Sequence, residues 1–168
     1  LIAIFAFVVI ILVRSQIIQN YVFVGDNEYS MVTRLEAWKI MFQIIEKNPL
    51  FGVGPANYYF YTPFYNIMGY SVSFNSHNNY IDLLAQLGIV GFFIFSWWAF
   101  EIAKLGFSLL KVQLDPFEKS FVVTAIGGLA GTLVAAFLGD WLIPFIYNIG
   151  MEGFRSSVLA WVFLGSLV

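Results

Sequence analysis

The sequence predicts an all-α, polytopic transmembrane helix bundle with a long extracytoplasmic loop that contains an amphipathic helix. Of the 168 residues, 60% are hydrophobic and 11% are charged, whereas about 25% are charged in soluble domains. The mean hydropathy is +0.82, and the apolar residues gather in long runs between polar segments. Both ends of the chain fall inside apolar runs, so we expect a fragment of a larger multi-span protein, here one membrane domain over 1–168.

Each span is justified by an uncharged run. The first run ends at Arg14 and extends about 20 Å, too short for a whole span. The second has an uncharged core over 87–100, with Glu101 and Lys104 near its far end. The third is rich in Gly and Ala, which allow helices to approach closely. The expected spans cover about 1–14, 83–107, 120–139 and 156–168.

The connections between these spans set the expected orientation. A short turn over 108–119 carries Lys111 and Lys119, and basic residues favour the cytoplasmic side. The loops over 15–80 and 140–155 are therefore expected to face outward. The long loop is the place where we look for a functional site.

A capping box is predicted within the long loop. Thr33 would cap a helix, and Glu36 would reach back from the third helical position. The helix would continue to Lys47 and end before Asn48-Pro49. Apolar residues recur at a period near 3.6 and predict one apolar face, made of Leu35, Trp38, Met41, Phe42 and Ile45.

Two outward arginines are candidates for binding an anion. The capped helix would place Arg34 in its first turn, where the helix dipole disfavours a cation, so a bound anion would offset that cost. Guanidinium suits phosphate because its planar fork bonds two oxygens. Arg14, at the end of the first span, is a weaker candidate for the same anion. The alternative for Arg34 is a solvated position at the membrane surface, and the alternative for Arg14 is anchoring of the helix to lipid phosphates.

His77, the only histidine, lies in Ser76-His77-Asn78-Asn79-Tyr80, just before the second span. An imidazole at the membrane surface is a candidate general base, and the alternative is a residue that caps a helix or contacts lipid. Asn75 or Ser76 is expected to cap the following helix. Asn78, Asn79 and Tyr80 offer polar groups for orienting His77 or for holding sugar hydroxyls, and capping of the helix is their alternative role.

Three outward carboxylates leave alternatives open. Asp82, Asp140 and Glu152 can orient His77 or bind a metal, but a simple interfacial charge is favoured for each. Other classes are less compatible with the sequence. A net charge of −2 without a basic run does not indicate nucleic-acid binding. The absence of cysteine and the single histidine make a zinc site unlikely from sequence alone.

The ordered motifs RLEAW (34–38), NPLFGVGPANY (48–58) and HNNYIDLLAQLGIVGF (77–92) resemble the O-antigen ligase and polymerase superfamily. The resemblance covers 34–95, with a weaker part over 140–165. It implies a multi-span enzyme of the bacterial inner membrane, with its active loop facing outward.

The resemblance also implies a reaction. Members move a glycan from a polyprenyl-diphosphate carrier to a hydroxyl of a glycan, lipid or protein, without a metal or other cofactor. His77 aligns with the proposed base and Arg34 with a diphosphate-binding arginine. Arg14, Asn57, Asn78 and Tyr80 are the expected substrate-binding residues, and membrane lipids surround the protein.

Two other functions remain as alternatives. A polymerase of O-antigen or exopolysaccharide would share these motifs, because the motifs do not specify the acceptor. A membrane transporter or anion-binding protein would instead place ionisable residues and helix breaks inside the spans. The apolar positions over 87–100 and 121–138 argue against it.

Overall fold

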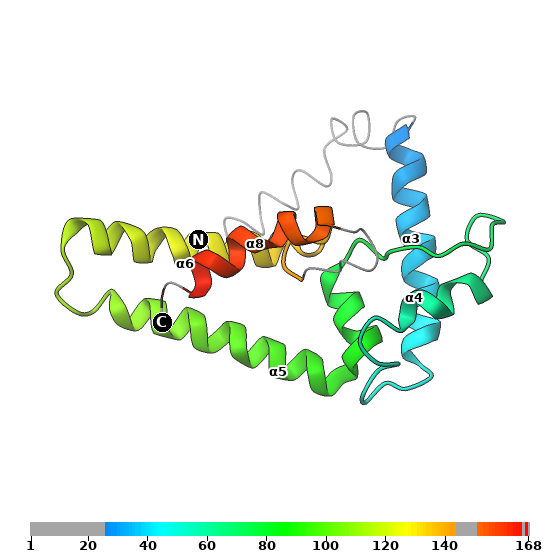
Figure 1. Ribbon diagram of the computed structural model, residues 1–168, viewed down its shortest axis with the longest axis horizontal. Coiled ribbons are helices and arrows are strands. Elements are labelled where there is room, and N and C mark those ends of the chain that lie inside the picture. Colours follow the sequence, from blue (N-terminus) through cyan, green and yellow to red (C-terminus); the bar gives the residue numbers. More distant parts are fainter. Residues whose placement is uncertain (1–25, 144–150, 166, 168) are drawn as a thin grey trace, which may run out of the picture. The chain divides into compact units, whose positions relative to one another are not determined.

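The computed structural model describes residues 26–143, 151–165 and 167, and its regular structure there is helical (Figure 1). The expectation of an all-α chain is confirmed. The chain divides into two compact units, Leu1–Glu36 and Ala37–Val168. The expected first span and Arg14 lie outside the described residues.

Helix α3 (Asp26–Ile45) starts seven residues before the predicted capping position. The capping box at Thr33 and Glu36 is therefore wrong. Thr33 lies inside the helix, where its hydroxyl donates a hydrogen bond of 2.8 Å to the carbonyl of Tyr29. This back-bond to the preceding turn is the usual use of a threonine within a helix.

The buried face of α3 also differs from the predicted face. Met41 is fully buried as predicted, but Leu35 and Phe42 are 46% and 50% exposed. The buried positions of α3 among its described side chains are Ala37, Ile40, Met41 and Ile44. The smaller Ala37 and Ile40 allow close packing, and the larger Phe42 is left outside.

A first hydrophobic core joins this face of α3 to two later segments. Two short helices, α4 (Tyr58–Tyr61) and η1 (Thr62–Phe64), follow a turn at 49–54 that contains two glycines. Tyr58 is fully buried. Ile81 and Ala85 of the next helix complete the cluster. These contacts place the segment before the second expected span against α3.

Helix α5 (Asn79–Leu109) is 31 residues long and is broken at Gly88, which has φ 63° and ψ −167°. The break is filled by the turn at 49–54. The amides of Ile89 and Val90 donate to the carbonyls of Pro49 and Leu50 at 2.9 and 3.2 Å. The carbonyls of Ala85 and Gln86 accept from Val53 and Gly54 at 2.8 and 3.0 Å. The turn therefore satisfies the backbone groups that the break exposes.

Helices α6 (Pro116–Ala135) and α8 (Met151–Gly165) complete the second unit. Asp115 caps α6, Pro116 occupies its first turn, and Glu118 closes a capping box. This helix begins four residues before the expected third span at 120. Helix α6 contacts both α5 and α8, and a second, smaller core contains Val122, Ala125 and Leu167.

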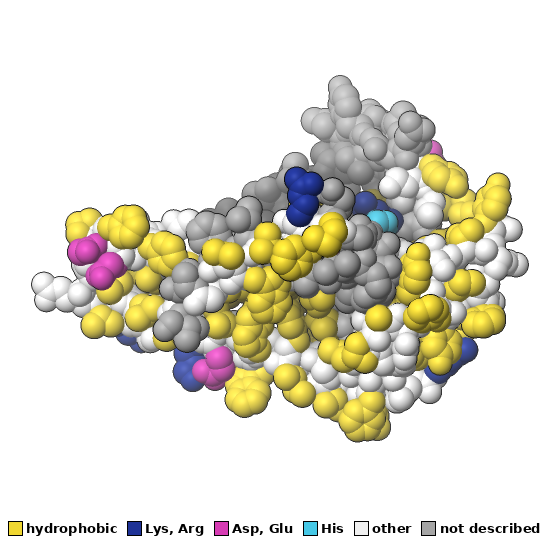
Figure 2. Space-filling view, in the orientation of Figure 1, with side chains coloured by type: hydrophobic (Ala, Val, Ile, Leu, Met, Phe, Trp, Pro, Cys, Tyr) yellow, Lys and Arg dark blue, Asp and Glu magenta, His cyan; other side chains and the backbone are white. Residues whose placement is uncertain are grey.

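Both α5 and α6 are long and apolar enough to cross a membrane. After its break, α5 continues for about 20 residues, the length that a hydrocarbon core of about 30 Å requires. Hydrophobic side chains cover the surface of α5 in Figure 2, and Phe93, Trp97 and Phe100 are more than 60% exposed. Aromatic surfaces of this kind are suited to lipid or to further helices rather than to water.

Candidate functional site

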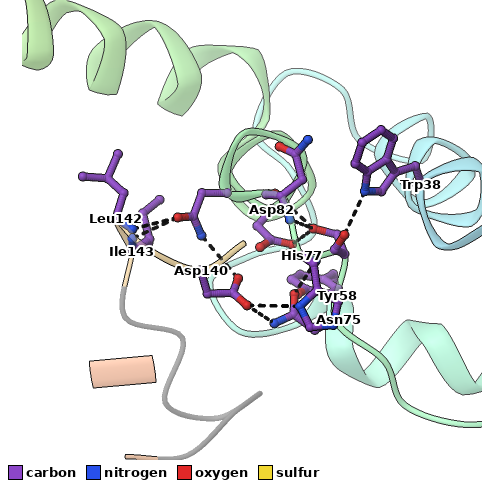
Figure 3. A network of polar contacts seen from close by, with 11 residues as sticks. Trp38, Tyr58, Asn75, His77, Asp82, Asp140, Leu142 and Ile143 are labelled. Atoms are coloured by element: carbon purple, nitrogen blue, oxygen red, sulfur yellow. Dashed lines mark hydrogen bonds and ion pairs between the residues drawn. The ribbon is translucent and has the colours of Figure 1, made fainter. Parts of the chain in front are cut away.

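His77 lies at the apex of a tight turn directly before α5. Its φ is 52°, in the left-handed region, which L-residues other than glycine seldom adopt. The His77 amide donates to the side-chain oxygen of Asn75 at 3.0 Å, which closes the turn (Figure 3). The imidazole is 47% exposed.

Asp140, from the segment after α6, reaches the same turn. Its Oδ2 lies 3.6 Å from His77 Nδ1, and its side chain is only 5% exposed. The side-chain amide of Asn75 donates to Asp140 Oδ2 at 2.7 Å, and that of Asn79 donates to Asp140 Oδ1 at 3.4 Å. Figure 3 shows His77, Asn75 and Asp140 directed toward one another. A buried carboxylate held in this way can orient an imidazole and stabilise its protonated form.

Two asparagines fix the start of α5 beneath this turn. Asn78 is its N-cap, and its side-chain oxygen accepts from the amides of Tyr80 and Ile81 at 3.0 and 3.3 Å. The cap is thus Asn78, for which capping was the alternative role, and not Asn75 or Ser76, which were the first candidates for the cap. Asn79 is fully buried and accepts from the amides of Leu142 and Ile143 at 3.0 and 3.3 Å. Asn79 therefore holds the segment that carries Asp140.

The residue before His77 is anchored on both sides. Ser76 is fully buried, and its hydroxyl donates to Asp82 Oδ1 at 2.6 Å. Its carbonyl accepts from Trp38 Nε1 of α3 at 2.8 Å. The turn is thus attached to α3, to α5 and to the segment after α6.

The predicted substrate-binding residues that are described have partners inside the protein. Asn57 donates to the carbonyl of Val53 at 2.9 Å, and the hydroxyl of Tyr80 donates to the carbonyl of Leu133. Asn78 is occupied by the cap. Asn57 is exposed and Tyr80 half-buried, so their part in binding stays a prediction.

The charged candidates fall into different environments. Simple interfacial charges were favoured for Asp82 and Asp140, but neither is a free surface charge, because they are 0% and 8% exposed. Arg34 is half-buried and belongs to the first unit. Glu152 lies in α8, and its side chain is outside the described part of the chain. Within the described ranges, no three His, Cys, Asp or Glu side chains form a metal-binding group.

Sequence reasoning left the role of Asp140 open and assigned Asn75 only as a helix cap. The two residues lie 65 positions apart in the chain, so no local pattern connects them. The available signal was that Asp140 follows an apolar run on the side expected for His77. Only the packing of α5 against α6 brings the two together.

In the part of the chain that the structure describes, two helices are long and apolar enough to cross a membrane, and a polar centre lies at the start of one of them, α5. A model of the O-antigen ligase family matches residues 1–96, more than half of the chain, and the chain belongs to that family. The resemblance found in the sequence is thereby confirmed. The match includes Arg34 and His77 but ends before Asp140. No curated protein and no solved structure matches the chain.

Proposed function

We propose that this chain carries the catalytic centre of a membrane glycosyltransferase that moves a glycan from a polyprenyl-diphosphate carrier to an acceptor hydroxyl. The contact between the exposed His77 imidazole and the buried Asp140 carboxylate is the observation that supports this most. Membership of the O-antigen ligase family supplies the class of reaction. In this proposal, the chain lies in the bacterial inner membrane and the His77 turn faces outward.

His77 acts as the general base in this proposal. Because Nδ1 faces Asp140 at 3.6 Å, Nε2 takes the proton of the acceptor hydroxyl. The hydroxyl oxygen forms a bond to the anomeric carbon, and the bond from that carbon to the diphosphate oxygen breaks. The electron pair leaves with the carrier diphosphate, and His77 later returns its proton to water. Such catalysis contributes roughly 10²–10⁴ in rate.

Arg34 binds the diphosphate in this proposal, through the two-oxygen contact that guanidinium makes with phosphate. Arg14 adds a second cation, and Asn57, Asn78 and Tyr80 contribute polar contacts to sugar. The acceptor is a glycan, lipid or protein hydroxyl. A polymerase of the same superfamily would use the same base and the same donor.

The break in α5 is the one observation that favours a transporter. In transporters, broken helices present free backbone groups to the cargo. Here the turn at 49–54 forms hydrogen bonds with four such groups at the break. These four backbone groups already have hydrogen-bond partners within the protein, so the glycosyltransferase remains the better supported function.

The test is glycan transfer by the full-length protein in vesicles that contain polyprenyl-diphosphate glycan and a candidate acceptor. We expect His77→Ala to lower kcat by roughly 10²–10⁴. We expect Arg34→Ala to raise the KM for the donor, with a smaller effect in Arg34→Lys, which keeps the charge but loses the planar fork. The acceptor that gains sugar identifies ligase or polymerase.

Lys39→Ala is the matched control for Arg34→Ala, because Lys39 is an exposed cation on the same helix. Lys39→Ala should leave kcat and the KM for the donor unchanged. Wild-type transfer by His77→Ala, at equal amounts of inserted protein, would reject His77 as the base. Anion flux in vesicles without any transfer would instead support the transporter.

A further inference from the structure

Asp82 is a fully buried carboxylate that the proposed reaction does not use. It lies in the first turn of α5, five residues after His77. Its Oδ1 accepts the Ser76 hydroxyl at 2.6 Å, and its Oδ2 accepts no hydrogen bond from the described residues. A buried polar atom without a partner costs about 1–3 kcal/mol. A carboxylate is therefore a poor choice at this position for stability alone.

The Ser76 hydroxyl is the group through which Asp82 reaches the site. Ser76 precedes His77, and the amide of Asn78, on the other side, donates to Ser76 Oγ at 3.0 Å. Asn78 in turn caps α5. His77 is thus an exposed residue between Ser76 and Asn78, which are both buried. The Ser76 hydroxyl forms hydrogen bonds that fix the positions of both.

The backbone of His77 needs this restraint. A left-handed conformation costs a non-glycine residue about 1–2 kcal/mol, and such strain persists only where the surroundings determine the conformation. Asn75 holds the His77 amide, and Trp38 holds the Ser76 carbonyl. At 2.6 Å, the bond from the Ser76 hydroxyl to Asp82 is shorter than the bonds that Ser76 accepts from Trp38 and Asn78.

We propose that Asp82 is a positioning residue for the transfer reaction: through Ser76, it holds His77 in the left-handed conformation that directs the imidazole toward Asp140. This inference rests on the proposed function, because it requires His77 to be the base. Asp82 does not act on the substrate. Its loss should lower the rate at which bound substrates react, while substrate binding is preserved.

The test is a set of double-mutant cycles with the full-length protein and the transfer assay described above. Asp82→Asn and Ser76→Ala weaken the same hydrogen bond from its two ends. Each should lower kcat about tenfold, because small displacements of a catalytic group have effects of this order or larger. The KM values for donor and acceptor should stay unchanged.

The same two substitutions are then made in His77→Ala, and the residual transfer is measured over longer times. Since a positioning residue acts through His77, neither substitution should lower the residual rate further. Gln86→Leu is the matched control, because Gln86 is another buried polar residue of α5. It should leave kcat per folded molecule unchanged in both backgrounds.

Rates are expressed per folded molecule, and Ser76→Ala carries the test where Asp82→Asn does not fold. An equal loss in both backgrounds would overturn the inference, since Asp82 would then act independently of His77. The inference would also be overturned if Asp82→Asn and Ser76→Ala kept the wild-type kcat while His77→Ala was inactive. Full activity of His77→Ala would instead overturn the proposed function.

Discussion

His77 combines an exposed side chain with a backbone that the protein holds in a strained conformation. The surrounding polar residues have defined partners: Asn79 and Asp140 are buried, and Asn75 is half-buried. Strain at one exposed residue, supported by a buried polar network, is common where a side chain must be held for catalysis. The site therefore consists of one reactive group and several residues that position it.

The charge of Asp140 should matter for turnover. Asp140→Asn keeps the size of the side chain but removes the charge that stabilises the imidazolium form of His77 during proton transfer. We expect kcat to fall by roughly tenfold, less than for His77→Ala, with the donor KM unchanged. Steady-state transfer rates at saturating donor and acceptor measure this.

Asp115→Asn serves as the control for the loss of a carboxylate. Asp115 is exposed and caps α6 away from the turn, so its replacement should leave kcat unchanged. If the Asp140→Asn variant had the wild-type kcat, the His77–Asp140 contact would have no part in the reaction.

The break in α5 depends on two glycines that face each other across the turn at 49–54. A Cβ on Gly88 would lie 2.4 Å from the carbonyl carbon of Leu50, and a Cβ on Gly52 would lie 2.3 Å from that of Gln86. Both glycines have positive φ, of 63° and 71°. The glycine-rich turn is therefore a part of the helix architecture, because its backbone replaces helical hydrogen bonds of α5.

Gly88→Ala should destabilise the protein. The added methyl group collides with backbone, and φ of 63° costs alanine about 1–2 kcal/mol before any collision. We expect the midpoint of thermal unfolding in detergent to fall by several degrees, in line with a loss of that size.

Gly127→Ala on α6 is the control, because a Cβ added at Gly127 would meet nothing within 4 Å and the backbone there is helical. Alanine favours a helix over glycine by up to about 1 kcal/mol, so this midpoint should stay or rise. Equal midpoints for Gly88→Ala and wild type would mean that the break tolerates a side chain.

At the scale of the whole molecule, the chain is an integral membrane protein of the O-antigen ligase family. The His77 turn precedes α5, whereas the connection between α5 and α6 lies at the opposite end of α5. If α5 crosses the bilayer, these two segments lie on opposite sides. The basic residues of the connection favour the cytoplasm for that end.

Cysteine labelling tests this orientation, because the chain contains no cysteine. Ser73 precedes the His77 turn and Gln113 lies between α5 and α6, and both are exposed. In spheroplasts, a membrane-impermeant maleimide should label Ser73→Cys directly and Gln113→Cys only after permeabilisation. The experiment uses a parent protein without other reactive cysteines, and that parent is the control. The reverse pattern would invert the proposed orientation.

Apolar runs, the 3.6-residue period and turn residues were sufficient to predict helices near 34–47, 83–107 and 120–139. The boundaries were less accurate. Thr33 matched a capping pattern but lies inside α3, because the acidic residues before it also form helix. Leu35 and Phe42 fit the predicted apolar face and are exposed, since packing against Tyr58 and Ile81 selects a different face.

Composition and ordered local motifs were enough to predict that the chain is helical and belongs to a family of membrane proteins. The same motifs make His77 and Arg34 the leading candidates for chemistry, which stays a prediction. Three further features required the folded chain: Asp140 meets His77, Asp82 is buried against Ser76, and α5 is broken around a glycine turn. These contacts join residues that no local pattern links, so their geometry follows from packing rather than from local preference.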